Sequence, residues 1–136
     1  MERQKTLVVD ASLAIKWFLK EENSDKALII RENHISGKTL LIVPELIFLE
    51  VTNALRYKKL DLKKISYINK SLWEFQFKTQ KIDKLILDKT IENSIKYNIT
   101  IYDALYVTLA QIHGTFLITA DKELYKVPNV IALEKI

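Results

Sequence analysis

The amino-acid sequence predicts an α/β protein, a three-layer α/β/α sandwich with a central, mainly parallel sheet of four to five strands. Short apolar runs alternate along the chain with longer stretches of helical periodicity. The runs are apolar at successive positions rather than at every second one, which is typical of strands buried on both faces of a parallel sheet. The chain has 136 residues, so residues 1–136 are expected to form one domain.

The elements expected in the first half of the chain begin with a short β-branched strand that ends at Asp10. In order, we expect a strand over 6–9, helices over 12–20 and 25–35, a strand over 39–43, and helices over 44–58 and 61–75. Pro44 is placed in the first turn of its helix, where a proline is tolerated. Asp61 is expected to cap the last of these helices, because its carboxylate can accept a bond from an unpaired backbone N–H there.

The second half of the chain continues the same alternation. In order, we expect a weak strand over 78–82, helices over 84–97 and 100–113, a strand over 115–118, a helical turn over 121–125 and a last strand over 130–133. The helix over 100–113 is apolar almost all round, so it should lie inside the protein, and Gly114 is expected to end it. In a parallel sheet of this kind, ligands bind beyond the carboxyl ends of the strands.

Composition excludes several classes of function. The chain has no cysteine, which excludes disulfides, thiolate metal sites and a cysteine nucleophile. The apolar stretch from Leu7 to Leu19 is interrupted by Asp10 and Lys16, so we expect neither a signal peptide nor a membrane span, and a cytoplasmic location. The net charge of +4 mildly favours anionic partners. Most of the cations are lysines, which suit contact with a phosphate backbone more than the reading of bases.

Two acidic residues follow predicted strands. Asp10 comes directly after the strand over 6–9, and Asp121 comes shortly after the strand over 115–118. Each could serve only as the cap of the helix or turn that follows, a common role for aspartate. Each would also stand at the edge of the sheet where ligands bind. Taken singly, neither position decides between the two roles.

Glu50 and Asp103 are predicted to lie on inward helix faces. On a helical wheel Glu50 falls away from the solvated stripe, on the side of Leu46, Ile47, Ala54 and Tyr57. An inward carboxylate is costly unless it is hydrogen-bonded or bound to a cation, and the alternative is a glutamate at the edge of the core whose head reaches water. Asp103 has the spacing of a capping box with Thr100, yet the helix that it opens is apolar almost all round.

The four acids carry more information together than singly. They are Asp10, Glu50, Asp103 and Asp121. Lys16 and Lys122 are the cations close to them in sequence. If the four carboxylates converge, they repel one another, and a hard divalent cation, Mg²⁺ or Mn²⁺, relieves that repulsion. Zinc is disfavoured, because His34 and His113 are expected to be ordinary surface or helix-end residues.

Several blocks of the sequence resemble the PIN-domain family, and the nearest branch is that of the VapC toxins of VapBC toxin–antitoxin pairs. The blocks are Val-Val-Asp-Ala-Ser at 8–12, Pro-Glu-Leu at 44–46, Glu-Val-Thr-Asn-Ala-Leu at 50–55, Tyr-Asp-Ala-Leu-Tyr-Val at 102–107 and Leu-Ile-Thr-Ala-Asp at 117–121. They occur in the family's order and at its usual spacing, over essentially the whole chain. The resemblance implies a compact α/β/α sandwich and a ribonuclease that binds Mg²⁺ or Mn²⁺.

Carried over to this chain, the resemblance gives each acid a role. Asp10 and Asp103 match the family's central metal ligands. Glu50 matches the acid on the third helix, and Asp121 matches the acid after the fourth strand. The expected reaction is metal-assisted hydrolysis of RNA, in which loss of Asp10 or Asp103 abolishes cleavage.

The resemblance also implies partners and supporting residues. Ser12 and Thr119 match small hydroxyl residues that orient the acids or bound water. A small VapB-like antitoxin would mask the acids with an extended or helical segment that carries a basic residue, and a homodimer is expected. The aromatic residues around Trp17 and Trp73 could form the dimer face, although core packing is the alternative. Lys16 could meet a substrate phosphate or be an ordinary surface lysine.

Other classes of function stay open at the level of sequence. An aspartate after the first strand is also the phosphate acceptor of some phosphotransferases. The haloacid-dehalogenase pattern, however, requires a second aspartate where Ser12 stands, and the acid pair and late lysine of a receiver domain are not found. A non-catalytic PIN-like module that binds RNA or a partner is the other alternative, against which the complete set of four acids argues. DNA also stays open as a substrate.

Overall fold

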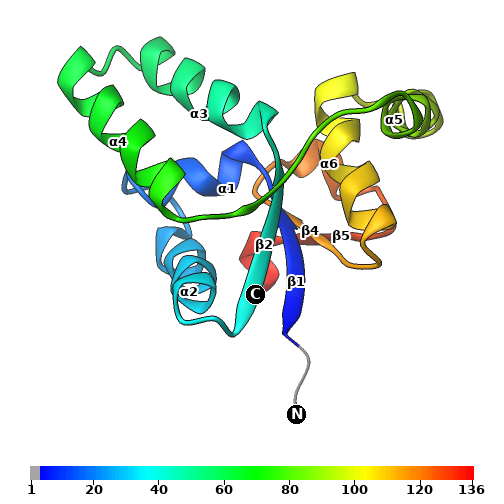
Figure 1. Ribbon diagram of the computed structural model, residues 1–136, viewed down its shortest axis with the longest axis horizontal. Helices are drawn as coiled ribbons and strands as arrows, with labels where there is room; N and C mark the ends of the chain where they lie inside the picture. The colour runs from blue at the N-terminus through cyan, green and yellow to red at the C-terminus, as the bar shows by residue number, and fades with distance from the viewer. Residues whose placement is uncertain (1–3) are drawn as a thin grey trace.

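Strands and helices alternate along the chain (Figure 1). The structure is a computed structural model that describes residues 4–136. The strands are β1 (Lys5–Val9), β2 (Thr39–Pro44), β3 (Lys78–Gln80), β4 (Leu117–Thr119) and β5 (Val130–Ala132). The helices are α1 (Ala11–Ile15), α2 (Ser24–Ile35), α3 (Leu46–Tyr57), α4 (Leu62–Glu74), α5 (Lys84–Tyr97) and α6 (Ile101–Ile112), with short 3₁₀ helices η1 (Lys122–Leu124) and η2 (Leu133–Lys135). Across residues 4–136, none of these helices has the length and apolar character to cross a membrane.

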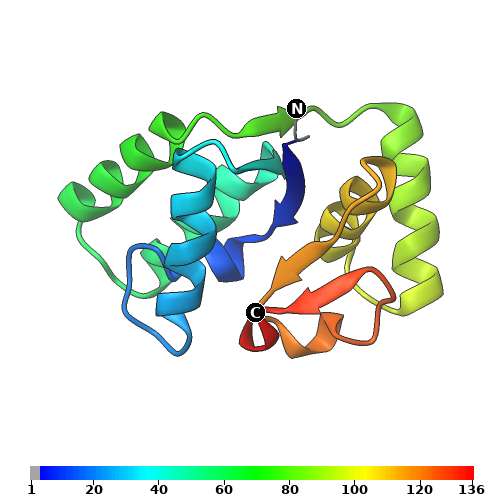
Figure 2. The same cartoon turned by 90° about the horizontal axis from the view of Figure 1, so that it is seen from below.

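The five strands form one parallel sheet in the order β3-β2-β1-β4-β5. β1 is central, with Leu7 opposite Leu41 of β2 and Val8 opposite Leu117 of β4. Figures 1 and 2 show α1 and α2 on one side of the sheet and α5 and α6 on the other, which confirms the expected α/β/α sandwich. Because the strand order reverses at β1, its carboxyl end is the switch point at which ligands bind in such sheets.

Helix α6 anchors this end of the sheet from inside. It packs across β1 and β2, whereas α2 packs on the opposite face of β2. Residues 104–110 of α6 are all buried, which confirms the prediction of an interior helix. The Thr100 hydroxyl caps the helix by accepting a bond from the Asp103 backbone N–H at 3.0 Å. The cap therefore uses only the backbone N–H of Asp103. The carboxylate of Asp103 is not needed for the cap and can face the sheet edge.

Helix α1 is shorter than the sequence predicted. It ends at Ile15 rather than near Lys20. Trp17 turns inward instead, is only 6% exposed, and donates from Nε1 to the Ala27 carbonyl at 2.8 Å. This contact with α2 ends the helix, since a continued helix would carry the indole away from its acceptor.

Two other boundaries also differ from expectation. Pro44 is the last residue of β2 and not the first turn of α3, because the pairing of β2 with β3 continues to Gln80 opposite Pro44. β4 covers Leu117–Thr119 rather than 115–118, because β1 pairs with it only from Leu117 onward. The expected cap of α4 is confirmed: Asp61 accepts a bond from the Lys64 backbone N–H at 2.9 Å.

The aromatic residues near Trp17 belong mainly to the core. The Trp17 ring lies 5.6 Å from that of Phe75 and 5.9 Å from that of Phe77. Trp73, by contrast, is 56% exposed and stacks on Phe48 with ring centroids 3.8 Å apart. Core packing, the alternative to a dimer face, therefore accounts for Trp17 and its neighbours, while Trp73 presents one face to solvent.

Candidate active site

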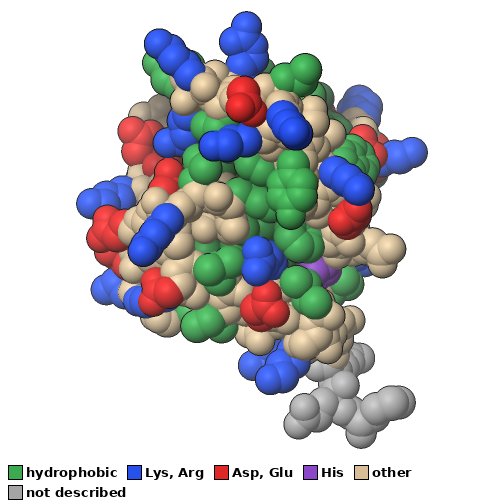
Figure 3. All heavy atoms as spheres, turned by 90° about the vertical axis from the view of Figure 1, so that its left-hand side faces the viewer, with side chains coloured by type: hydrophobic (Ala, Val, Ile, Leu, Met, Phe, Trp, Pro, Cys, Tyr) green, Lys and Arg blue, Asp and Glu red, His purple; other side chains and the backbone are tan. Residues whose placement is uncertain are grey.

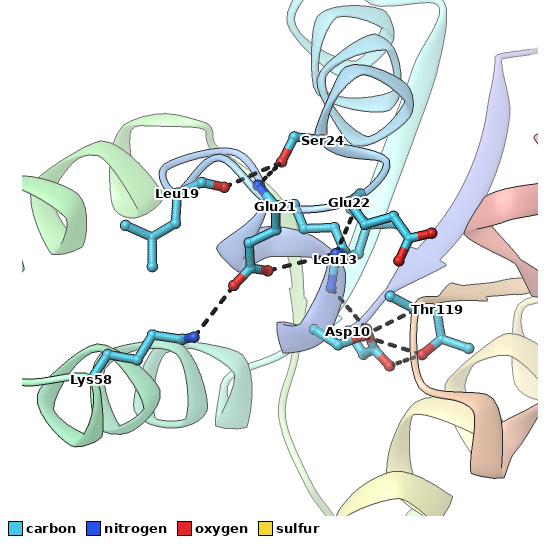
Figure 4. Close-up of polar contacts among 11 residues, drawn as sticks. Asp10, Leu13, Leu19, Glu21, Glu22, Ser24, Lys58 and Thr119 are labelled. Atoms are coloured by element: carbon cyan, nitrogen blue, oxygen red, sulfur yellow. Dashed lines mark hydrogen bonds and ion pairs between the residues drawn. The ribbon is translucent and has the colours of Figure 1, made fainter.

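Asp10 lies in a hydrogen-bonded network at the carboxyl end of β1. Its Oδ1 accepts bonds from the Leu13 backbone N–H at 3.2 Å and the Ser12 hydroxyl at 2.6 Å. Its Oδ2 accepts from the Thr119 hydroxyl of β4 (Figure 4). The side chain is only 5% exposed. Asp10 thus caps α1, as one interpretation of the sequence had it, and the same carboxylate is also fixed by a neighbouring strand.

Ser12 and Thr119 join the ends of β1 and β4. Their hydroxyl oxygens are 3.3 Å apart. Ser12 Oγ accepts from the Ala120 backbone N–H at 3.1 Å, and Thr119 Oγ1 accepts from the Asp121 backbone N–H at 3.0 Å. Each hydroxyl thus accepts a bond from a backbone N–H and donates its own proton to Asp10. The two residues therefore orient Asp10 and hold the start of the loop after β4.

Glu50 projects from α3 toward α6 and is half-buried, so it lies between the inward position and the core-edge position that the sequence left open. Tyr57, which the wheel places on the same inward side, is instead 87% exposed. Its Oε1 accepts a bond from the Tyr106 hydroxyl at 2.6 Å. Tyr106 is 1% exposed, so its hydroxyl needs an internal partner, and Glu50 provides it. On the solvent side, Glu50 opens onto a groove along α3 that Asn53 and Ala54 also line.

The electrostatics of the site place Asp103 between the other acids. Burial raises the pKa of Asp10 to about 6 against the opposing effect of its hydrogen bonds, and the charge of Asp103 adds to the rise. Burial also raises the pKa of Glu50, again with a contribution from Asp103. The pKa of Asp103 is itself raised by burial and then by Asp121. The four acids chosen from the sequence therefore influence one another across one end of the sheet.

The residues of the site fit a hard divalent cation. The donors are carboxylates, the ligands that Mg²⁺ and Mn²⁺ prefer, and within residues 4–136 none of the four acids forms an ion pair with a lysine or arginine. A cation would offset the repulsion that adds to burial in raising the pKa values of Asp10, Glu50 and Asp103. In this same part of the chain no three acidic or histidine side chains are gathered tightly enough to enclose an ion, so the acids form an open set and not a closed cage.

Lys16 does not behave as an ordinary surface lysine. Its side chain is 11% exposed, its ammonium donates to the Glu22 carbonyl at 2.7 Å, and it lies 3.6 Å from the Glu21 carboxylate. Glu21 also lies 3.3 Å from Lys58 at the end of α3 (Figure 4). One carboxylate thus joins two cations and ties the loop after α1 to α3.

Both histidines have structural surroundings. His34 Nδ1 accepts from the Leu41 backbone N–H at 3.1 Å, and its Nε2 lies 2.7 Å from the Phe75 carbonyl oxygen. Because Nδ1 accepts, Nε2 must carry the proton that bonds Phe75. His113 is the residue that ends α6. His34 thus uses both ring nitrogens within the fold, and His113 is the helix-end residue that the sequence predicted.

Sequence reasoning misses two residues of the site. Tyr106 looks like one more apolar position of α6, although a buried tyrosine one helical turn after Asp103 needs a polar partner, and this signal could have been used. Glu123 donates from its backbone N–H to Asp121 Oδ1 at 3.0 Å, so Asp121 caps η1, and the charge of Glu123 helps to raise the pKa of Asp103. Nothing in the sequence around Glu123 separates it from a surface acid.

Comparison with known sequences identifies relatives over most of the chain. The sequence model of the PIN domain family matches residues 7–130. The protein named Ribonuclease VapC3 from Pyrobaculum aerophilum is 35% identical over 124 residues, which cover 87% of this chain and 91% of the relative. The region matched by the family model includes all four acids of the site.

Solved structures agree on the fold. A crystal structure of a protein from Pyrobaculum aerophilum has a TM-score of 0.73 at 24% identity, over 96% of this chain and 85% of that chain. A toxin–antitoxin complex from Klebsiella pneumoniae has a TM-score of 0.71 at 18% identity, over 93% and 97% of the two chains. Family match, relative and fold point the same way, and the chain therefore belongs to the PIN domain family.

Proposed function

We propose that this chain is a metal-dependent endoribonuclease of the VapC type, the toxin of a type II toxin–antitoxin system, and that it hydrolyses RNA phosphodiester bonds with Mg²⁺ or Mn²⁺. The observation that carries the proposal is the set of four acids around Asp103, which different elements bring to the carboxyl end of one sheet. The ribonuclease activity is supported by the name of the 35% identical relative.

In this proposal Asp10 and Asp103 hold the principal cation, and Glu50 and Asp121 complete a second metal site or position the attacking water. The chemistry that Mg²⁺ or Mn²⁺ supplies when bound in such a site is activation of a water and neutralisation of charge on the phosphate. The chain's own contribution is to hold its acids in place before RNA arrives. The hydroxyl groups around Asp10 do this for one acid, and Tyr106 does it for Glu50.

The hydroxyl residues Ser12 and Thr119 are positioning residues in this proposal. They donate to both oxygens of Asp10 and bond the backbone of the Asp121 loop. Residues that orient metal ligands commonly contribute roughly 10- to 100-fold to metal affinity or activity.

The test is cleavage of defined RNAs by the purified protein, with and without Mg²⁺ or Mn²⁺. We expect cleavage to require the cation and to fall to background in Asp10→Asn and in Asp103→Asn, because each loses a charged ligand. Asp88→Asn is the matched control, since Asp88 is an exposed aspartate of α5 paired with Lys84. Full activity in both site variants would rule out this site, and RNA binding without cleavage would indicate a non-catalytic module. A DNA of the same sequence, run in parallel, decides between the two nucleic acids.

The proposal includes partners. A small VapB-like antitoxin would mask the acids with a segment that carries a basic residue, which is consistent with the toxin–antitoxin complex among the structural neighbours. We also propose a homodimer, and action in the cytoplasm, where cellular RNA is found. Co-expression with the product of the neighbouring gene, followed by light scattering and a cleavage assay of the complex, tests the partner and the dimer together.

A further inference from the structure

One face of α3 continues from the acids to the end of the helix. Glu50, Asn53, Ala54, Tyr57 and Lys58 line a groove of about 470 Å³ along it. Their spacing of three and four residues places them on one side of the helix, away from its buried face. The volume lies within the range of roughly 300–1,000 Å³ that is common for ligand sites. The groove therefore begins at an acid of the proposed nuclease site and leads away from it.

Tyr57 is the aromatic residue of this groove. It is the last residue of α3 and is 87% exposed. It stands seven residues after Glu50, and a rise of about 1.5 Å per residue places it roughly 10 Å further along the helix. The exposed Tyr57 ring can stack on a base of an RNA strand whose phosphodiester lies at Glu50. Such stacking is open to any base, since every base has a π-face.

The net positive charge of the chain is concentrated in the tip between α3 and α4. The cations of residues 56–64 are Arg56, Lys58, Lys59, Lys63 and Lys64. All five are exposed, and the one acid among these residues, Asp61, is used to cap α4. Residues 56–64 thus have a formal charge of +4, the same as the whole chain, so the rest of the chain carries no net charge. Figure 3 faces this side of the molecule and shows basic side chains gathered over its upper part.

Lys58 connects the groove with this basic tip. It lines the groove, is 45% exposed, and lies 3.3 Å from Glu21. Glu21 also pairs with Lys16, so the single negative charge of Glu21 faces the positive charges of two lysines. The three side chains together have a net charge of +1, which can attract an anion. A phosphate that follows the groove from Glu50 past Tyr57 meets this charge next.

We infer that the groove and the basic tip, residues 56–64, bind a single-stranded segment of RNA beside the bond that is cut. Tyr57 stacks on an unpaired base, and Lys58 and Lys59 contact phosphates. This inference rests on the proposed function and assigns the surface of this chain that holds the strand beside the proposed acids. A duplex is disfavoured, because its bases stack on one another and offer no open face to the ring.

The first test concerns the ring of Tyr57. The anisotropy of a short fluorescein-labelled single-stranded RNA of mixed sequence measures binding to the purified chain in EDTA. Tyr57→Leu should raise the Kd for the single strand about tenfold and leave the Kd for a perfect duplex of the same sequence unchanged. Tyr57→Phe, which keeps the ring, should bind like wild type. Ile95→Ala is the control, because Ile95 is an apolar side chain that is 77% exposed on α5, outside both the groove and the basic tip.

The second test concerns charge. In the same assay, the double variant Lys58→Gln/Lys59→Gln should lower the slope of log Kd against log salt by about 1.4, at about 0.7 for each phosphate contact on a single strand. Tyr57→Leu should leave that slope unchanged, since stacking releases no counterions. Lys89→Gln/Lys96→Gln is the control, because it removes the same charge from α5, at the opposite side of the molecule (Figure 1).

The outcomes separate this inference from the proposed function. Wild-type affinity in Tyr57→Leu, or an equal loss for single strand and duplex, overturns it. Loss of a dimer in Tyr57→Leu with unchanged RNA binding also overturns it and assigns the face to a second copy. Cleavage of the same RNA in Mn²⁺ is measured in parallel. If the RNA is cleaved but Tyr57 does not contribute to binding, the proposed nuclease activity stands and the role of the groove is contradicted. If binding depends on Tyr57 but no cleavage occurs, the role of the groove stands and the nuclease activity is contradicted.

Discussion

Asp10 illustrates how a single residue of the site affects the stability of the whole protein. Burial raises its pKa from 3.8 to about 6, so the folded state keeps a proton at pH values where the unfolded state releases it. Without metal, the stability that this proton confers is complete below about pH 4 and is lost as the pH rises through about 6. Above that pH, the ionised carboxylate lowers the free energy of unfolding by roughly 3 kcal/mol.

We therefore expect Asp10→Asn to be more stable than wild type at alkaline pH in EDTA, with an advantage that shrinks toward zero at acid pH. Asparagine keeps an oxygen that can accept from Leu13 and removes the buried charge. Urea unfolding at about pH 4 and about pH 8 measures the effect. These two pH values lie near the ordinary pKa of 3.8 and above the folded-state pKa of about 6, respectively. A difference between variant and wild type that does not change with pH would contradict the raised pKa.

Tyr106 gives a second prediction for a single residue. Tyr106→Phe removes the hydrogen bond to Glu50 and leaves the ring in the core. We expect Mn²⁺ to bind about tenfold more weakly, because residues that orient metal ligands usually contribute at least that much. Electron paramagnetic resonance of free Mn²⁺ measures the affinity, and a melting curve checks the fold. Tyr102→Phe, at an exposed tyrosine of the same helix, is the control, and equal Mn²⁺ affinity in all three proteins would argue against the role of Tyr106.

At the scale of elements, the start of α6 matters because Asp103 lies in its first turn. Thr100→Ala removes the cap of this helix and should cost about 1 kcal/mol of stability. It should also weaken Mn²⁺ binding, since a frayed first turn no longer fixes Asp103, and Thr100→Ser should restore both. Asp83→Ala removes the equivalent cap of α5, where Asp83 accepts from Ile86 N–H at 2.8 Å, and should lower stability alone. Equal Mn²⁺ affinities in the two alanine variants would show that the cap does not position the site.

The elements that the sequence predicts well are those defined by local chemistry. The Asp61 cap, the apolar α6 and the helix over 84–97 all follow from residues within the element itself. The end of α1 does not, because it depends on Trp17 reaching a carbonyl of α2. Pro44 was likewise placed wrongly, because its pairing partner lies in β3, far along the chain. Tertiary contacts of this kind leave no local signal.

At the scale of the whole molecule, Asp10 and Asp121 could be chosen because parallel strands all end at one edge of their sheet. Glu50 and Asp103 were chosen because they lie on inward helix faces. The order of the strands makes Asp10 and the segment after β4 neighbours. What the sequence did not reveal is the set of side chains that hold the acids, such as Tyr106 and Glu123, because these contacts depend on packing between elements. Exposure is also invisible in the sequence, so Tyr57 could not be told from a core tyrosine.

Cation binding should be visible in the stability of the entire protein. A ligand that binds only the folded chain stabilises it by about 2.7 kcal/mol at a hundred times its Kd. We expect Mn²⁺ to raise the melting temperature of wild type and to have a much smaller effect on Asp103→Asn, which lacks a proposed ligand. Calorimetry with and without Mn²⁺ measures both. A similar rise in the two proteins would mean that the cation binds elsewhere.

The order of the strands also bears on how the protein is made. β1 is translated first, yet one of its two neighbours is β4, the next-to-last strand. Thr119 is synthesised 109 residues after Asp10. Until then the first strand has one edge uncovered and its aspartate lacks the threonine hydroxyl. Under the proposed function, a growing chain that has not yet reached Thr119 and Asp121 therefore has an incomplete site.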